Sequence, residues 1–289
     1  HPTHLTKVIP LLRERGIRGT FMINPGKDEP GSRRRSNFQL HLNSWDSIAA
    51  KADQEFANHT AHHRGARGDD DMEAEIGGAA QAIWKLFPGR SKLIALNLGG
   101  GTQWETTRTL RHYLDKYHLF DALGNSTGMD DVYGNRVANF RRMLGQHIER
   151  GLWYRVHYHY IGPGLSSSEA NFRSVLDIVD QHKDVVWVAG MADIHKYLTE
   201  RAASKLALIE AAPNQLTFEF ACLTDPALYD QPLTIETTLP ANWKPEQVTV
   251  QPENGSLIPV RPVTVNGQTM LRFELPPRGG RYVIERTPR

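Results

Sequence analysis

The amino-terminal part of the chain alternates between apolar positions at helical spacing and short apolar runs that are typical of strands. Residues 5–14 carry the helical spacing and Gly16 follows them, whereas residues 19–24 form a short apolar run. A helical pattern at residues 45–51 and a strand pattern at residues 53–58 repeat this order. The succession predicts an α/β fold whose functional groups gather at the carboxyl ends of the strands.

Further strand patterns follow in the same part of the chain. They are predicted at residues 93–98, 120–123, 152–162 and 185–188. Aromatic and β-branched side chains dominate residues 152–162, and such residues favour strands. Three glycines, residues 99–101, follow the first of these runs. They either let the backbone approach a substrate or an ion, or form a simple turn.

The pattern changes after Lys205, where alternating apolar and polar positions predict antiparallel strands. The alternation covers residues 216–220, 233–237, 248–250, 270–275 and 282–284. We therefore expect two domains, at residues 1–204 and 205–289, the second of them an antiparallel β-sandwich. The second domain is interpreted either as a packing module or as a carbohydrate-binding module.

Charge and composition exclude several classes of function. The net charge is +2, with 34 Lys and Arg against 32 Asp and Glu, so nothing favours a nucleic-acid partner. No apolar run reaches the roughly 18 residues of a membrane span. Cys222 is the only cysteine of the sequence, which excludes an internal disulfide, and its place in a predicted strand predicts a buried thiol.

Two histidines directly after the strand at residues 53–58 have the spacing of a metal-binding pair. His59 and His63 are four positions apart, and on a helical turn two such positions share one face. Neutral imidazole nitrogens are ligands that zinc and similar divalent ions prefer. A solvated polar turn is the alternative interpretation of the same residues.

Two more histidines occur in the strand predicted at residues 152–162. His157 and His159 fall on one face of that strand, because side chains alternate along it. The polar loop at residues 125–135 is expected to border a cleft. Its two neighbouring carboxylates, Asp130 and Asp131, are expected to be solvated.

The segments HLTKVIPLLRERGIRGTFMINPG and EFANHTAHH together resemble the polysaccharide deacetylase, or NodB-homology, family. The second motif of that family is His-Ser/Thr-x-x-His, which His59, Thr60 and His63 match. The resemblance covers residues 1–201. It implies a distorted (β/α) barrel, one bound divalent metal, most often zinc, and hydrolysis of an N-acetyl or O-acetyl group on a sugar.

The resemblance also implies roles for individual residues. His59 and His63 would bind the metal, and His159, at a strand end before a glycine, would be the general acid. His157 lies one pair deeper in that strand, as a hydrogen-bonded core residue or beside the substrate. Trp187, in the strand predicted at residues 185–188, would line the substrate site as an aromatic wall, with core packing as the alternative.

One motif of the family does not occur in the sequence. This first motif, Thr-Phe-Asp-Asp-Gly, supplies the general base and the third metal ligand at the end of the first barrel strand. We expect that strand and its motif to precede His1 in the native chain. Residues 69–71 are all Asp, but they open the next predicted helix, where negative charge suits the positive amino end.

These observations together predict a metal-dependent hydrolase that removes acetyl groups from a carbohydrate. A non-catalytic glycan-binding relative and a deacylase of a small non-sugar amide are the alternatives, because a fold does not fix a substrate. Family habit predicts a periplasmic or extracellular bacterial location. The preference for ester or amide and the oligomeric state stay open.

Overall fold

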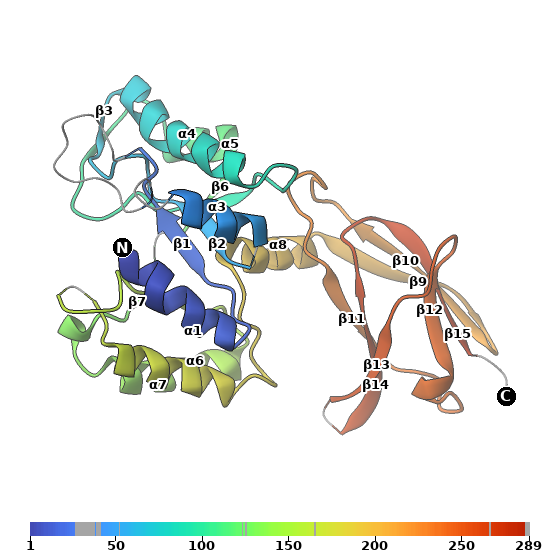
Figure 1. Cartoon of the computed structure of the whole chain (residues 1–289). Helices are drawn as coiled ribbons and strands as arrows, with labels where there is room; N and C mark the ends of the chain where they lie inside the picture. The colour runs from blue at the N-terminus through green and yellow to red at the C-terminus, as the bar shows by residue number, and fades with distance from the viewer. Residues whose placement is uncertain are drawn as a thin grey trace. The chain divides into compact units, whose positions relative to one another are not determined.

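The computed structural model describes residues 1–26, 38, 42–51, 53–122, 124, 126–164, 166–265 and 267–286 (Figure 1). The chain divides into two compact units, His1–Ala192 and Asp193–Arg289. The first unit contains parallel sheets and helices, and the second contains antiparallel sheets. The α/β class of the amino-terminal region and the antiparallel carboxyl-terminal region are therefore confirmed.

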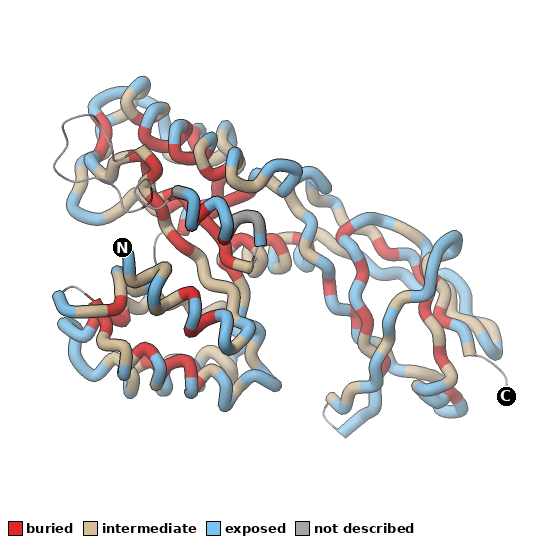
Figure 2. Tube along the Cα trace, in the orientation of Figure 1, coloured by how far each residue is buried: buried red, intermediate tan, exposed pale blue. Residues whose placement is uncertain are grey.

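The main sheet of the first unit is built from four parallel strands in the order β1-β2-β4-β6. The strands are β1 (Thr20–Ile23), β2 (Glu55–Asn58), β4 (Ile94–Leu96) and β6 (Leu119–Asp121). Every residue of β2 and β4 is buried. Figure 2 colours the buried residues of the chain red. Parallel strands covered on both faces are expected to read as short apolar runs, and these were predicted from such runs.

Helices connect and cover these strands. They are η1 (His4–Val8), α1 (Ile9–Glu14), α3 (Leu42–Lys51), α4 (Asp69–Leu86), α5 (Leu110–Lys116), α6 (Arg136–Arg150) and α7 (Glu169–Asp180). The helix predicted at residues 5–14 is present, although its first turn is π-helical. The three aspartates open α4 as expected. None of the described helices combines the length and apolar character of a membrane span.

Short parallel pairs complete the first unit. β3 (Ala66–Arg67) pairs with β5 (Trp104–Glu105), and β7 (Ser126–Gly128) pairs with β8 (Arg155–His157). A short 3-10 turn, η2 (Asp131–Tyr133), follows β7. Helices α6 and α7 pack against each other around a hydrophobic core, and Val156 of β8 packs against that core. The ladders described here join strands into an open sheet and separate pairs, so closure into a barrel stays a prediction.

A buried carboxylate joins the start and the end of the first unit. Glu55, which is 5% exposed, accepts a hydrogen bond from the Thr20 hydroxyl at 3.0 Å. The backbone N–H of Ala192 donates to the same carboxylate at 3.0 Å. Gly190 makes this approach possible, because a Cβ there would lie 2.1 Å from Glu55 Oε2.

The second unit contains two antiparallel sheets, with strand orders β12-β15-β10-β9 and β11-β14-β13. The strands are β9 (Ser204–Ala212), β10 (Gln215–Cys222), β11 (Leu233–Thr237), β12 (Val248–Pro252), β13 (Val260–Val265), β14 (Gln268–Leu275) and β15 (Gly280–Arg286), with the 3-10 turn η3 (Pro245–Gln247) before β12. One hydrophobic core contains side chains of both sheets, including the ring pair of Phe218 and Phe273. The alternation of apolar and polar positions predicted this arrangement.

Three local expectations are wrong. Residues 185–188 form no strand. In the predicted strand at residues 152–162, only Arg155–His157 forms a ladder. The Cys222 thiol, expected to be buried, is only partly covered. Helix α8 (Met191–Ala202) begins at the end of the first unit and precedes β9, so the change to antiparallel strands occurs at Ser204.

A second buried carboxylate lies within the second unit. Glu200 is fully buried, and its Oε1 accepts the Gln231 N–H at 3.0 Å. Its Oε2 has no hydrogen-bond partner among the described residues. Nearby, Lys196 Nζ lies 2.6 Å from Asp230 Oδ1. Burial raises the pKa of the Glu200 carboxyl to about 7, with the negative charge of Asp230 acting in the same direction and Lys196 opposing it.

This shift predicts how stability depends on pH. A glutamate ionises near pH 4.5 in the unfolded chain and near pH 7 in this position. The protonated form therefore stabilises the fold below about pH 4.5, and that contribution is lost as the pH rises through about 7. As the pH rises from about 5 to 8, the free energy of unfolding, measured by chemical denaturation, should therefore fall less for Glu200→Gln than for the natural chain. The exposed Glu210, changed to Gln, is the control, and an equal pH dependence for Glu200→Gln and the natural chain would refute the prediction.

Candidate functional site

The candidate metal-binding histidines lie in the loop after β2, at the carboxyl end of that strand. The imidazole rings of His59 and His63 meet edge to face, with centroids 4.7 Å apart. The predicted helical turn is wrong, because residues 59–64 form an irregular loop. Thr60 and His63 adopt left-handed backbone angles there, with φ 65° and 54°. These angles, rather than helical spacing, bring the two rings together.

A backbone carbonyl fixes the tautomer of His59. His59 Nδ1 lies 2.9 Å from the carbonyl oxygen of Asn97, which directly follows β4. A carbonyl only accepts hydrogen bonds, so Nδ1 carries the proton and Nε2 presents its lone pair. A metal-ligating histidine commonly has this arrangement, in which the other ring nitrogen donates to a backbone or carboxylate oxygen.

The glycine run after β4 makes room for the second imidazole. A Cβ at Gly99 would lie 2.5 Å from His63 Nε2, and Gly99 itself has φ +79°. The Asn97 side chain accepts the Gly99 N–H at 2.8 Å and so holds this turn. The His63 N–H donates to the Thr60 hydroxyl at 3.1 Å. Gly99 therefore allows close approach of the His63 ring. Residues 100 and 101 form a turn, as the second interpretation of the glycine run expects, and the approach to a substrate or an ion stays a prediction.

His159 forms a histidine–carboxylate pair. Its Nδ1 lies 2.6 Å from Asp130 Oδ2, and its backbone N–H donates to Asp130 Oδ1 at 3.2 Å. The His159 side chain is 48% exposed, whereas Asp130 is fully buried. The expectation that Asp130 is solvated is therefore wrong, because this loop carboxylate follows β7 and turns inward to the imidazole. The carbonyl of His159 in turn accepts from His4 Nε2 at 2.8 Å, and burial lowers the pKa of His4 to about 4.

Asp131 differs from its neighbour. It lies at the surface, where it accepts hydrogen bonds from the Ser168 N–H at 3.0 Å and from the Asn171 side chain at 2.9 Å. These two donors belong to the start of α7, so Asp131 connects its loop to that helix. The expected exposure is correct, and the side chain has a structural contact in addition.

His157 is the last residue of β8 and is exposed, so the interpretation as a core residue is wrong. Its Nδ1 lies 3.1 Å from the Ser126 hydroxyl, and its ring centroid lies 6.3 Å from that of His159. Partial loss of solvent around the imidazole, followed by the charge of His159, lowers the pKa of His157, while Asp130 opposes the shift. The structure thus brings the two predicted imidazoles together at one strand end.

Trp187 lies in an irregular segment, and 50% of its surface is exposed. Core packing is therefore wrong as its main role. Its neighbour Val185 is 68% exposed. The ring is accessible to a ligand, which keeps the aromatic-wall interpretation as a prediction.

His59 and His63 are the residues that would hold a divalent metal. Their ring contact, the His59 tautomer and the space at Gly99 fit such an ion. Catalytic zinc sites use three protein ligands. Across the described ranges, no three His, Cys, Asp or Glu side chains come together as a metal-binding group.

The sequence pattern did not indicate two carboxylates as partners of the histidines. Asp130 pairs with His159, and Glu75, in α4, accepts hydrogen bonds from His62 and Arg64 of the histidine loop. Glu75 is buried on the same helix as the apolar residues Met72 and Ile76, and a carboxylate among such positions is a signal for a buried acceptor.

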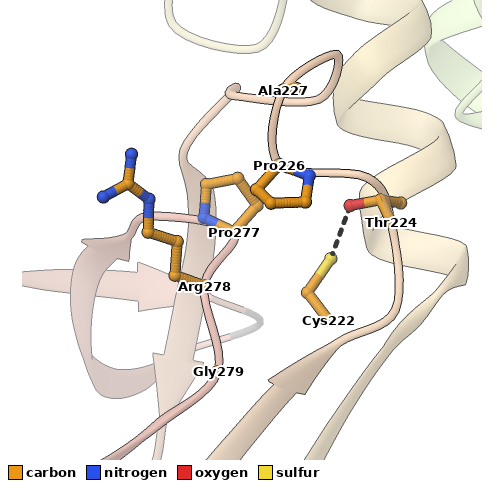
Figure 3. Close-up of a pocket in the computed structure, with 7 residues that line it drawn as sticks. All are labelled: Cys222, Thr224, Pro226, Ala227, Pro277, Arg278 and Gly279. Atoms are coloured by element: carbon orange, nitrogen blue, oxygen red, sulfur yellow. Dashed lines mark hydrogen bonds between the residues drawn. The ribbon is translucent and has the colours of Figure 1, made fainter.

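The second unit has an open pocket of its own, drawn in Figure 3. Cys222, Thr224 and residues 277–279 contribute to its lining. The Cys222 thiol lies 3.2 Å from the Thr224 hydroxyl. The pocket brings no pair of acid, base or metal-binding groups together, so the histidine sites of the first unit are the stronger candidates.

Comparisons with known proteins leave the site geometry as the main guide to function. No protein-family model, no curated protein and no solved structure matches the chain. Functional conclusions therefore depend on the side chains described above and on the motif resemblance around His59 and His63.

The close approach at Gly99 generates a mutational prediction. Gly99→Ala places a methyl group against the His63 ring in a strained backbone conformation, so it should lower Zn²⁺ affinity about 10–100-fold in isothermal titration. Gly100→Ala is the matched control, because a Cβ at Gly100 meets nothing within 4 Å. Equal Zn²⁺ affinities of the two variants would show that metal binding does not need the space beside His63.

Proposed function

We propose that this chain is a metal-dependent hydrolase that removes N- or O-linked acetyl groups from a carbohydrate. The observation that carries the proposal is that two histidine sites lie at carboxyl ends of parallel strands. One is the His59–His63 pair, and the other is the His159–Asp130 pair. The resemblance to polysaccharide deacetylases supports the same activity.

The first site supplies the metal ligands. His59 and His63 would hold the ion, for which zinc is expected from the imidazole ligands. When bound, the metal supplies the Lewis acidity that polarises the acyl carbonyl and activates water. The Asn97 carbonyl keeps the proton of His59 on Nδ1, so Nε2 carries the lone pair that would coordinate the ion.

The second site supplies the proton. Asp130 accepts the Nδ1–H of His159 and holds the ring in one orientation. Nε2 of this half-exposed side chain then gives its proton to the leaving amine or alcohol, as a general acid does. Asp130 acts through His159 and is a positioning residue.

The proposed substrate class rests on two exposed side chains of the first unit. His157 offers an exposed imidazole beside His159, and Trp187 offers an accessible aromatic face. Ligand sites commonly combine aromatic side chains with a small number of polar groups, and both kinds of group are exposed in this unit. An acetylated glycan is therefore the proposed substrate.

The proposal includes the finer architecture. The four-stranded sheet with the β7–β8 pair would form parts of a distorted (β/α) barrel, and the two antiparallel sheets of the second unit would form a β-sandwich. All of the proposed site residues belong to the first unit.

Acetate release tests the proposal directly. The full-length protein, incubated with Zn²⁺, should release acetate from acetylated oligosaccharides. Release from small acetamides alone would indicate the amide deacylase instead. Binding of the glycan without acetate release would indicate a glycan-binding protein and would refute hydrolysis.

The role of His159 predicts a mutant phenotype. His159→Ala should lower kcat by roughly 10²–10⁴-fold, the usual contribution of one general acid, and leave Zn²⁺ affinity unchanged. His59→Ala should lose both the acetate-releasing activity and the Zn²⁺ affinity. His157→Ala is the matched control in the same segment and should cause the smaller loss. The reverse order of the two losses would show that His157 is the acid.

A further inference from the structure

We infer that Glu75 is the positioning residue that holds the His59–His63 pair in its chelating arrangement. It acts through the two residues that flank His63 in the loop, His62 and Arg64. The inference rests on the proposed metal-dependent function and deepens it. It assigns the geometry of the metal site to a side chain of α4 that does not itself coordinate the ion.

Three donors of the histidine loop converge on this one carboxylate. The His62 N–H donates to Glu75 Oε2 at 2.9 Å. His62 Nδ1 lies 2.6 Å from Oε1, and Arg64 Nε donates to the same oxygen at 3.0 Å. The backbone contributes a fourth contact, in which the Ala61 N–H donates to the Glu75 carbonyl at 2.8 Å. Residues 61, 62 and 64 are thus all bound to one residue of the helix.

The loop needs such a constraint because of its backbone. Thr60 and His63 have left-handed φ values of 65° and 54°, which residues other than glycine adopt only when surrounding contacts hold them. The contacts of Glu75 lie immediately after the first of these residues and on both sides of the second. Without them, the loop is free to relax to right-handed angles, and relaxation at His63 turns its ring away from His59.

The burial of Glu75 makes the contacts obligatory. Its side chain is fully buried, and a buried carboxylate requires hydrogen-bond donors. Arg64 supplies a positive charge and is itself held by Asp71, whose Oδ1 lies 2.8 Å from Arg64 Nη2. The loop and the carboxylate therefore depend on each other.

His62 itself is assigned to this support rather than to the metal. Its Nδ1 is occupied by Glu75, and the opposite side of its ring packs against the Gly26 backbone. A Cβ at Gly26 would lie 2.8 Å from His62 Nε2. Gly26 also donates its N–H to the Ala61 carbonyl at 2.9 Å, which keeps Gly26 beside the loop.

Glu75→Gln tests the assignment with little change in side-chain size. The amide nitrogen replaces an acceptor by a donor and faces a loop N–H, so at least one of the three bonds is lost. Glu73→Gln is the matched control on the same helix, because Glu73 binds Arg108 and Lys116 and not the histidine loop.

The first measurement uses the metal-free protein below its melting transition. The contact of the His59 and His63 rings should give an NMR cross-peak in the natural chain and in Glu73→Gln, and Glu75→Gln should lose it. A cross-peak that persists in Glu75→Gln, or that is missing from the natural chain, overturns the inference. Global destabilisation alone lowers the melting temperature without removing this cross-peak.

The second measurement separates this inference from the proposed function. Glu75→Gln should bind Zn²⁺ about 10–100-fold more weakly than Glu73→Gln in isothermal titration. If the natural chain binds no Zn²⁺, the proposed function fails, and the NMR result still decides the role of Glu75. If both variants bind Zn²⁺ like the natural chain, the role of Glu75 is refuted and the function stands.

A rescue experiment covers the case in which Glu75→Gln does not fold. His62→Asn keeps a side-chain N–H near the position of Nδ1, whereas His62→Ala removes it. The asparagine variant should retain the ring cross-peak and most of the Zn²⁺ affinity, and the alanine variant should lose both. Equal behaviour of the two variants would contradict the inference.

Discussion

A carboxylate that is removed from water must be surrounded by donors, and this requirement organises the first unit. Glu75 collects donors from the loop after β2, and Asp130 collects the ring and backbone N–H groups of His159. Glu55 does the same for residues at the two ends of the unit. The donors to Glu75 and Asp130 include the imidazoles of His62 and His159. The hydrogen bonds that these buried carboxylates require therefore also fix the orientation of an imidazole ring.

The strands and the position of the histidine pair could be predicted because the signals are local. A parallel strand that is covered on both faces is apolar along its length, and β4 (Ile94–Leu96) lies within such a run. Because strand ends carry function in this kind of fold, His59 and His63 stood out directly after β2. The antiparallel sheets were predicted for a similar reason, since their alternation reflects one buried and one open face.

The partners of the histidines could not be read from the same signals because they are distant in sequence. Asp130 precedes His159 by 29 positions and lies in a polar loop, so it looks solvated until the fold turns it inward. The left-handed angle at His63 is equally invisible, since no glycine marks it. Residues 185–188 show the opposite failure, because Val185 and Trp187 are apolar but exposed and form no ladder.

The bond between Glu55 and Ala192 has a consequence for synthesis of the chain. The two residues are separated by 137 positions, and translation produces the carboxylate long before the N–H that matches it. Until residue 192 is made, the buried Glu55 carboxylate of β2 lacks the backbone N–H that it accepts in the folded unit. The Glu55 carboxylate therefore gains its full set of donors only after nearly all of the first unit has been translated.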